Sequence, residues 1–107
     1  MLTFVATGQI EMQPADYSLA QNYPNPFNPA TIIEFSMPKS GYAAIEITDV
    51  RGRFVQRLGA DVYSQGTHQV KWNGLDKRGN RVTSGVYFYR LKIAGQPVNA
   101  KKMILLK

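Results

Sequence analysis

The sequence has no cysteine, a single histidine and no apolar run that approaches the length of a membrane span. Without cysteine, neither a disulfide nor a Cys/His zinc site can hold a small domain, so packing alone must stabilise it. Because a spanning helix needs roughly 20 apolar residues, no membrane insertion is expected. The N-terminal residues lack the basic and apolar regions of a signal peptide, so the signal of an exported protein would lie upstream.

The scarcity of histidine limits the chemistry that the chain can perform. His68 lies within a strand pattern that also contains Val70 and Trp72, and no G-x-S-x-G motif is present to expose a serine. The segment 73–80 has one carboxylate and two cations, which is unlike a calcium loop, and there is no glycine-rich phosphate loop. We therefore expect no enzymatic activity, no catalytic or metal-binding residue and no cofactor.

Charge is distributed unevenly along the chain. Residues 1–49 contain five acidic residues and one basic residue, whereas residues 50–107 contain twelve basic and two acidic residues. The basic residues are interleaved along expected strands and turns and are not clustered in a helix or an arm. This pattern favours a basic surface on a β domain over a nucleic-acid interface, so no nucleic-acid partner is expected.

Alternating apolar residues predict strands through most of the chain. In residues 68–93 one strand face is formed by His68, Val70 and Trp72, and another by Tyr87, Tyr89, Leu91 and Ile93. We expect these two strands to form a hairpin that carries much of the core. Further strands are expected at residues 31–37, 42–49, 54–58 and 100–107, with a short edge piece at 61–63. The residues expected to point inward on the first two of these are Ile33, Phe35, Met37, Ala43, Ile45 and Ile47.

The motif D-x-R-G occurs twice, at residues 49–52 and 76–79. Aspartate at the first position can accept a hydrogen bond from the backbone two residues later, and glycine at the last position tolerates a left-handed conformation. Both sites are therefore predicted to be type I turns.

Prolines at positions 24, 26 and 29 shape the proline-rich segment, residues 17–29. They remove three backbone donors and exclude both a helix and a central strand. Leu19, Tyr23 and Phe27 are the candidate anchors of this segment. We expect it to protect a sheet edge from aggregation. A role as a ligand for an aromatic groove is the weaker alternative, because P-x-x-P spacing occurs only at positions 26 and 29.

About seven short antiparallel strands, regular turn signals and no helical periodicity predict an all-β, immunoglobulin-like or fibronectin type III-like β-sandwich. Its last strand contains the apolar run 103–106 between lysines, and we expect this run to be buried on both sides. The sandwich is expected to span residues 17–107. Residues 1–16 are interpreted as a linker or the tail of a preceding region, with a short edge strand at residues 2–5.

Six motifs follow one another in a specific order. They are L-x-Q-N-Y-P-N-P-F-N-P at 19–29, I-x-F-x-M-P at 33–38, I-x-D-x-x-G-x-x-V-x-x-L at 47–58, G-x-H-x-V-x-W-N-G-x-D-x-x-G at 66–79, V-x-S-G-V-Y-F-Y-R-L at 82–91 and K-K-M-x-L-L-K at 101–107. This set resembles the C-terminal sorting domain, type A, of the bacterial type IX secretion system. It also resembles the related immunoglobulin-like domain of the flagellar hook-capping protein. The match covers about residues 17–107.

The resemblance implies a non-catalytic sorting and anchoring module of a secreted or cell-surface bacterial protein. Such domains direct an N-terminal cargo through the periplasm and outer membrane, and are commonly removed or exchanged for a lipopolysaccharide anchor. The implied partners are the type IX secretion machinery and the cargo domain, and the module is expected to be monomeric. The machinery usually needs the C-terminal strand of such domains. This places docking, by addition of a strand, at Lys101, Lys102, Met103, Ile104, Leu105, Leu106 and Lys107.

The alternative function is a carbohydrate-binding or spacer β-sandwich appended to an extracellular glycoside hydrolase. Exposed, coplanar aromatic side chains on one face would favour it, and alternation leaves only Phe88 on the basic face. A third option is an assembly module like the hook cap, which would oligomerise through an open sheet edge.

Overall fold

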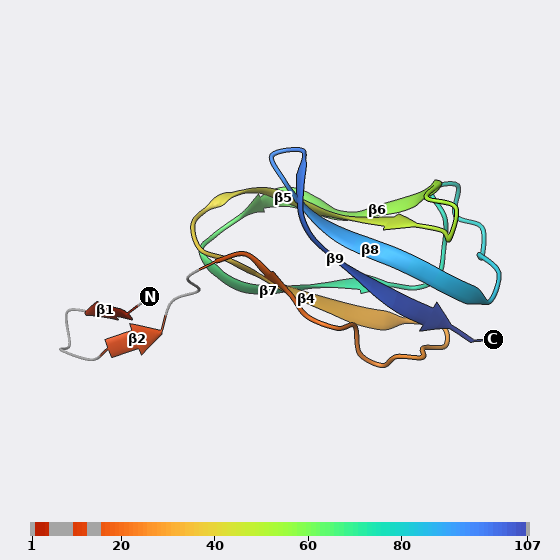
Figure 1. Cartoon of the computed structure of the whole chain (residues 1–107), viewed down its shortest axis with the longest axis horizontal. Coiled ribbons are helices and arrows are strands. Elements are labelled where there is room, and N and C mark those ends of the chain that lie inside the picture. Colours follow the sequence, from red (N-terminus) through yellow and green to blue (C-terminus); the bar gives the residue numbers. More distant parts are fainter. Residues whose placement is uncertain (1, 5–9, 13–15, 107) are drawn as a thin grey trace.

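The computed structural model describes residues 2–4, 10–12 and 16–106, and the regular structure of these residues consists of strands (Figure 1). Strands β1 (Leu2–Phe4) and β2 (Ile10–Met12) pair only with each other, in a two-stranded sheet of their own. The strand expected at residues 2–5 is therefore present, but its partner is β2. Residue 5 of that expectation lies outside the described residues.

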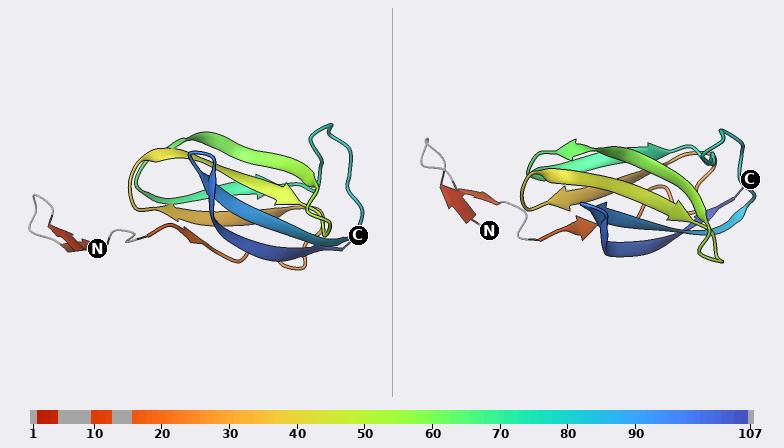
Figure 2. Two further views of the ribbon diagram at one scale, coloured as in Figure 1. Left: turned by 45° about the horizontal axis from the view of Figure 1, so that its top comes forward. Right: turned by 90° about the horizontal axis from the view of Figure 1, so that it is seen from above.

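Two sheets packed face to face form the sandwich, and Figure 2 shows both layers from two further directions. The three-stranded sheet is antiparallel, in the order β3 (Ser18–Leu19), β4 (Thr31–Met37) and β7 (Gly66–Trp72). The four-stranded sheet is also antiparallel, in the order β6 (Phe54–Tyr63), β5 (Gly41–Thr48), β8 (Gly85–Ile93) and β9 (Gln96–Leu105). The predicted all-β, immunoglobulin-like sandwich is confirmed.

The core lies between the two sheets, and sequence alternation identified most of its residues. All six residues expected to point inward from β4 and β5 are buried. On β6, Val55 is buried and Phe54 is exposed. Burial of these side chains is the main source of stability, since each large apolar side chain contributes about 1.5–3 kcal/mol.

Strands β7 and β8 do not form the hairpin expected for residues 68–93. Strand β7 pairs with β4 in one sheet and β8 pairs with β5 and β9 in the other, so residues 73–84 cross from one layer to the other. Trp72 and Tyr87 therefore meet across the core, with ring centroids 5.4 Å apart. Alternation shows which face of a strand is apolar but not which strand pairs with it, and this is why the prediction was wrong.

Both D-x-R-G motifs form the predicted turns. The Gly52 and Gly79 N–H groups donate to the carbonyl oxygens of Asp49 and Asp76, each at 2.9 Å. The Oδ1 atom of each aspartate also accepts bonds from the backbone N–H groups two and four residues later. Both glycines have left-handed φ values, of 80° and 83°. These aspartates are therefore turn residues.

Strand β6 is one continuous strand where the sequence indicated two pieces, 54–58 and 61–63. Its pairing with β5 shifts register between Ala43 and Ile45, opposite the point where Gly59 adopts a φ of 57°. A Cβ atom at Gly59 would lie 2.5 Å from Cγ1 of Val70. The close approach of β7 thus requires glycine at this irregularity in the edge strand.

Candidate functional site

The terminal part of β9 contains the residues predicted to dock with the secretion machinery. Met103 and Leu105 are 0% and 2% exposed, Ile104 is half-buried and Leu106 is 52% exposed. The prediction that the run 103–106 is buried on both sides was therefore wrong. Strand β9 lies at the edge of its sheet with one face toward solvent, so burial alternates along it.

The lysines of this part of the strand also differ. Lys102 is exposed and lies opposite Phe88 on the outer face of the four-stranded sheet, whereas Lys101 is half-buried and lies opposite Tyr89. Lys107 lies outside the described residues. Of the described docking residues, Lys101, Lys102, Ile104 and Leu106 thus have side-chain surface that a partner can reach, and the other two belong to the core.

The proline-rich segment closes the outer edge of β9. The Phe27 N–H donates to the Ile104 carbonyl and the Leu106 N–H donates to the Phe27 carbonyl, both at 3.0 Å. Oδ1 of Asn25 accepts a bond from the Ile104 N–H at 2.9 Å, and Nε2 of Gln21 donates to the Lys102 carbonyl at 2.7 Å. The segment thus covers a sheet edge as expected, and protection from aggregation by this cover stays a prediction.

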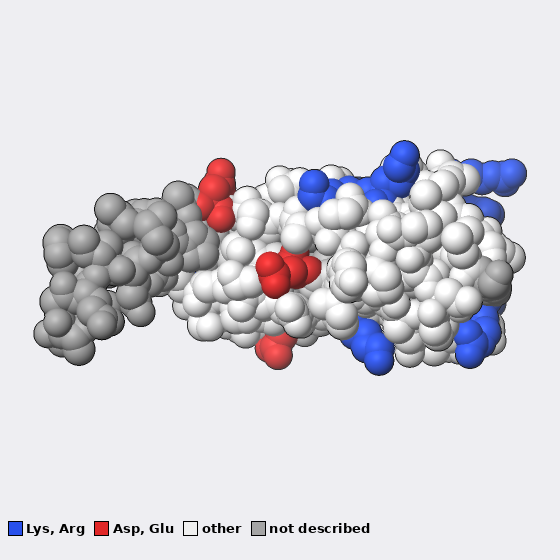
Figure 3. Space-filling view, turned by 90° about the horizontal axis from the view of Figure 1, so that it is seen from below, with Lys and Arg blue, Asp and Glu red and all other residues white. Residues whose placement is uncertain are grey.

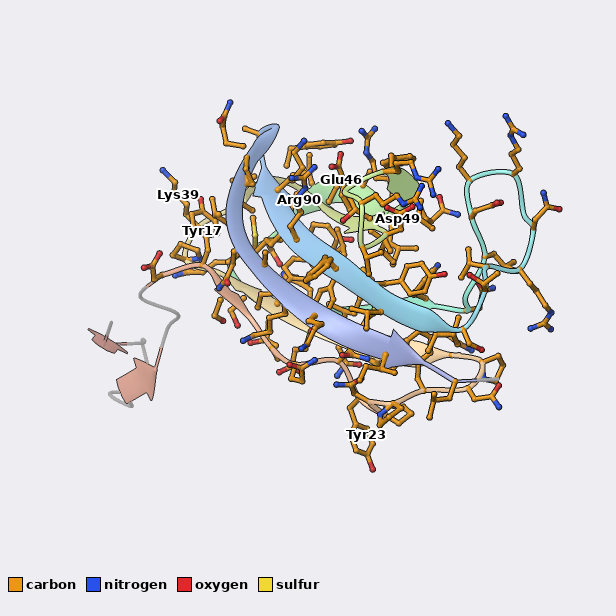
Figure 4. All side chains as sticks on the ribbon, turned by 45° about the vertical axis from the view of Figure 1, so that its right-hand side comes forward. Tyr17, Tyr23, Lys39, Glu46, Asp49 and Arg90 are labelled. Carbon is orange, nitrogen blue, oxygen red and sulfur yellow. The ribbon has the colours of Figure 1, made fainter. Side chains whose placement is uncertain are left out.

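Two of the three predicted anchors hold this segment in place. Leu19 and Phe27 are 4% and 1% exposed, and the Phe27 ring packs 5.6 Å from the Trp72 ring. Tyr23 is 80% exposed and points away from the sandwich (Figure 4), so its prediction as an anchor was wrong. Its backbone pairs with Ile32, an exposed residue on the outer face of the three-stranded sheet, and this pairing directs the Tyr23 side chain to solvent.

A buried network of uncharged polar groups, here called the Asn22 network, attaches the segment to both sheets. Nδ2 of Asn22 donates to Oγ1 of Thr31 and to the Pro24 carbonyl. The Asn22 backbone N–H donates to the Tyr89 hydroxyl at 2.8 Å, and this hydroxyl donates to the Ala20 carbonyl at 2.7 Å. Burial raises the pKa of the Tyr89 phenol, and the bond from the Asn22 N–H offsets part of that rise.

The closed edge bears on how a partner could dock. Residues 102, 104 and 106 already use outward backbone groups in bonds to the proline-rich segment. An added strand would have to displace that segment before it could pair there. Recognition through exposed side chains needs no such displacement.

The contacts of the single histidine, His68, are of a kind that stabilises the fold. Nε2 of His68 lies 2.7 Å from the Ser64 carbonyl oxygen, and its ring packs against the rings of Tyr63 and Phe35. Within residues 16–106 and the two short N-terminal strands, no three His, Asp or Glu side chains gather closely enough to hold a metal ion. The same described residues contain no helix of the length and hydropathy that a bilayer span requires.

A charged cluster on the outer face of the four-stranded sheet was missed by the sequence analysis. Alternation places Glu46 on the wet face of β5, yet Glu46 is only 5% exposed. Its carboxylate accepts bonds from Nη2 of Arg57 at 3.1 Å, Nη2 of Arg90 at 3.3 Å and Nζ of Lys92 at 3.4 Å. We call these four residues the Glu46 cluster, and Figure 4 labels two of them, Glu46 and Arg90.

The electrostatics of the Glu46 cluster favour the ionised carboxylate. Burial acts to raise the pKa of Glu46, but the hydrogen bond from Arg57 and the charges of Lys92 and Arg90 outweigh it, so the pKa lies below its ordinary value. The cluster draws on three strands, β6, β5 and β8, which are adjacent only in the folded sheet. No local sequence signal could have identified it.

Comparison with known proteins places this geometry in a family. Residues 30–96 match the FlgD Ig-like domain family. No curated protein matches the chain. Among solved structures, PorU from Porphyromonas gingivalis aligns with a TM-score of 0.71 and 23% identity over 87% of this chain and 10% of PorU. PorZ from the same organism, described as an essential bacterial surface component of the type IX secretion system, aligns with a TM-score of 0.53 and 25% identity over 81% of this chain and 11% of PorZ.

The FlgD protein of P. aeruginosa shows the same fold. It aligns with a TM-score of 0.57 and 19% identity over 86% of this chain and 68% of FlgD. The present chain thus spans only about a tenth of the length of PorU and of PorZ. Because the family match covers more than half of its residues, the chain belongs to the FlgD Ig-like domain family.

Proposed function

We propose that this chain is a non-catalytic sorting and anchoring module that directs a secreted or cell-surface bacterial protein through the type IX secretion system. In this proposal it is a C-terminal sorting domain of type A, its partners are the secretion machinery and an N-terminal cargo domain, and it acts as a monomer. The likeness to PorU and PorZ supports the link to this secretion system.

The observation that carries the proposal is the contact between two distant motifs. Asn25 and Phe27 belong to the N-Y-P-N-P-F-N-P motif, and both bond to the backbone of the K-K-M-x-L-L-K motif at Ile104. The motif set that suggested a sorting domain therefore converges on the strand proposed to dock. A sorting signal needs such a fixed presentation, because a partner binds a preorganised surface at lower entropic cost.

The residues proposed to dock differ in burial. Met103 and Leu105 hold the strand in the core, while Lys102 and Leu106 present exposed side chains to a partner. We propose docking through these exposed side chains together with Lys101, Ile104 and Lys107. Strand addition at the same place would first require release of the proline-rich segment.

The test fuses residues 17–107 to the C-terminus of a periplasmic reporter, in a bacterium with and without a working type IX system. Sorting predicts reporter outside the cell only when the system is intact. The double variant Lys102→Glu with Leu106→Asp should abolish export because both side chains are exposed docking residues, and it spares the core.

The matched control is Val98→Asp, at a 42% exposed position on the same strand but outside the docking residues. This variant should be exported like the parent. Periplasmic retention of the parent fusion in both strains would contradict the sorting role. Equal export of the double variant and the control would contradict the assignment of the docking residues.

The non-catalytic part of the proposal is supported by the roles of the polar side chains. His68 contacts a backbone carbonyl and two rings, and Asp49 and Asp76 accept backbone bonds within turns. A purified protein spanning residues 17–107 should turn over none of the ester, glycoside or phosphate substrates in a general hydrolase panel. Activity that disappears in a His68→Gln variant would contradict this.

A carbohydrate-binding or spacer role remains the second candidate, and one observation favours carbohydrate binding. The sequence left only Phe88 on the basic face, but Tyr42 and Phe54 are exposed on the same outer face of the four-stranded sheet. Because that face is basic, an acidic carbohydrate would bind it better than a neutral one.

A further inference from the structure

The outer face of the four-stranded sheet has a shallow hollow of about 170 Å³ beside the Glu46 cluster. We call it the basic hollow. Its lining comes from three strands and the turn between β8 and β9, and consists of Tyr42, Ala44, Glu46, Arg57, Lys92 and Gly95. Ala44 is buried, lies opposite Lys92 and contributes a small, apolar part of the lining. The hollow is thus a preformed feature of rigid strands.

Positive charge exceeds negative charge in this hollow. Two cations, Arg57 and Lys92, line the hollow beside one carboxylate, that of Glu46, so the lining has an excess of one positive charge. Arginine has five N–H donors and lysine has three. Arg57 and Lys92 each use one donor on Glu46 and keep the others for a ligand. The hollow therefore offers charge-assisted donors that are already held in position by Glu46.

Among the residues that the structure describes, the opposite face of the sandwich has no comparable concentration of basic residues. The surface seen from below in Figure 3 is largely uncharged, and its Lys and Arg side chains lie toward the margins. On the outer side of the three-stranded sheet, β4 presents Ile32, Glu34 and Ser36. An anionic partner would therefore distinguish the two faces by charge.

An exposed aromatic side chain lies beside the cations. Tyr42 is 49% exposed and lines the hollow directly. The ring of Phe54 is less available, because Arg57 and Lys77 lie 5.9 Å and 5.7 Å from its centroid. An aromatic face next to cations matches a sugar acid, whose C–H groups pack on the ring while its carboxylate reaches the donors.

The size of the hollow favours a polymer over a free small molecule. Small-molecule sites usually occupy about 300–1,000 Å³ and enclose most of their ligand. A shallower site gains affinity from repeated contacts along one chain. On the same outer face, Phe88 is 40% exposed and lies opposite Lys102, which provides a second aromatic and basic contact.

We propose that the basic hollow binds a carboxylated sugar unit of an acidic polysaccharide, with Arg57 and Lys92 bonding the carboxylate and Tyr42 packing on the sugar ring. Single-stranded nucleic acid fits less well, because it needs a series of aromatic platforms along a groove. An extended acidic peptide would pair with a strand edge, and the hollow lies on the face of the sheet. The site does not depend on a sorting role and stands even if that role fails.

The experiment titrates the isotopically labelled protein spanning residues 17–107 with a galacturonate hexamer and follows amide shifts by NMR. A neutral galactan hexamer and inorganic polyphosphate serve as the two comparison probes. We expect shifts centred on Tyr42, Ala44, Lys92 and Gly95, weakening as salt rises because the donors are near the surface. The neutral hexamer should bind at least tenfold more weakly than the acidic one.

Three variants separate the contributions of charge, space and aromatic contact. Arg57→Gln should weaken galacturonate binding about five- to tenfold, since bonds to charged groups are among the strong ones. Ala44→Leu should block binding by filling the hollow without a change of charge. Tyr42→Ala should weaken binding of the galacturonate hexamer but leave polyphosphate binding unchanged. Lys71→Gln, which removes an exposed cation from the other sheet, should change either affinity less than twofold.

Thermal unfolding of each variant shows whether the fold is retained. Binding of galacturonate that is insensitive to Ala44→Leu and Tyr42→Ala would overturn the proposal, even if charge removal weakened it. The same conclusion would follow if polyphosphate bound as tightly as galacturonate and shifted the same amides, or if neither anion bound. A secretion assay is not needed, so failure here is distinguishable from failure of the sorting role.

Discussion

The Asn22 network and the Glu46 cluster each contain a nearly buried polar side chain, but they differ in whether donors are left over for a ligand. Asn22 is 2% exposed and Glu46 is 5% exposed. The Asn22 network is uncharged, lies between the proline-rich segment and the sheets, and satisfies its donors internally. The Glu46 cluster lies under solvent-facing cations and leaves positive charge uncompensated. The first arrangement fixes the chain, whereas the second combines a fixed position with a surplus of donors.

Phe27→Ala should have the largest effect on the proline-rich side of this comparison. The side chain is 1% exposed against Trp72, so its loss should lower the free energy of unfolding by about 3–5 kcal/mol. The hydrogen bonds from residue 27 to β9 should also open, because the ring anchors that backbone. Chemical denaturation measures the first effect, and amide exchange at residues 104 and 106 measures the second. Protection at those amides equal to that of the parent would argue against the ring as the anchor.

Asn22→Ala should cost about 2 kcal/mol, because Thr31 and the Pro24 carbonyl both lose a buried donor. The loss should be the same at pH 5 and pH 8, since no group of the network changes charge in that range. Urea unfolding at the two pH values provides the measurement. A strong pH dependence of the loss would show that the network is coupled to a titrating group.

Glu46→Gln should cost about 1–2 kcal/mol at pH 7 and change the acid dependence of stability. The folded-state pKa of Glu46 lies below the ordinary value of 4.5, so the stabilisation by its carboxylate is present above pH 4.5 and is lost as pH falls through the folded pKa. The difference between parent and variant should therefore shrink as pH decreases below 4.5. Denaturant midpoints measured from pH 7 to pH 3 test this, and a constant difference would contradict the assigned role of the carboxylate.

Tyr23→Ala should have the smallest effect, below about 0.5 kcal/mol, since its side chain is 80% exposed. It is the matched control for Phe27→Ala, because both residues lie in the same proline-rich segment. Thermal unfolding of the two variants side by side separates the anchor from its exposed neighbour. A large loss at Tyr23 would mean that its ring has a packing role in the folded state.

Sequence patterns predicted which face of a strand is buried far better than they predicted which strands pair with each other. The inward residues of β4 and β5 and both D-x-R-G turns depend on local periodicity or local hydrogen bonds, and all were identified. The pairing of β7 with β4 is a contact between distant residues, and the alternation of residues 68–93 contains no information about it.

At the candidate site, too, local features were predicted well and contacts between distant residues were not. The sequence correctly predicted a last strand in this region, although β9 spans Gln96–Leu105 and the expected strand was 100–107. Its burial was misjudged because the run 103–106 does not show that β9 is an edge strand. The role of the proline-rich segment could be inferred from missing backbone donors, whereas the exposure of Tyr23 depends on which side of β4 its backbone pairs with. The Glu46 cluster combines three strands and could be found only in the folded sheet.

The bonds between residues 25–27 and residues 104–106 also determine when this domain can close. The Asn25 carboxamide and the Ile104 amide that it binds are 79 positions apart in the chain. Such distant contacts cannot form until the later residues are available. The proline-rich segment therefore cannot pair with β9 until residues 104–106 are available, and the edge of β9 stays uncovered until then. The complete fold therefore forms only when residues up to 106 are free to pair with the proline-rich segment.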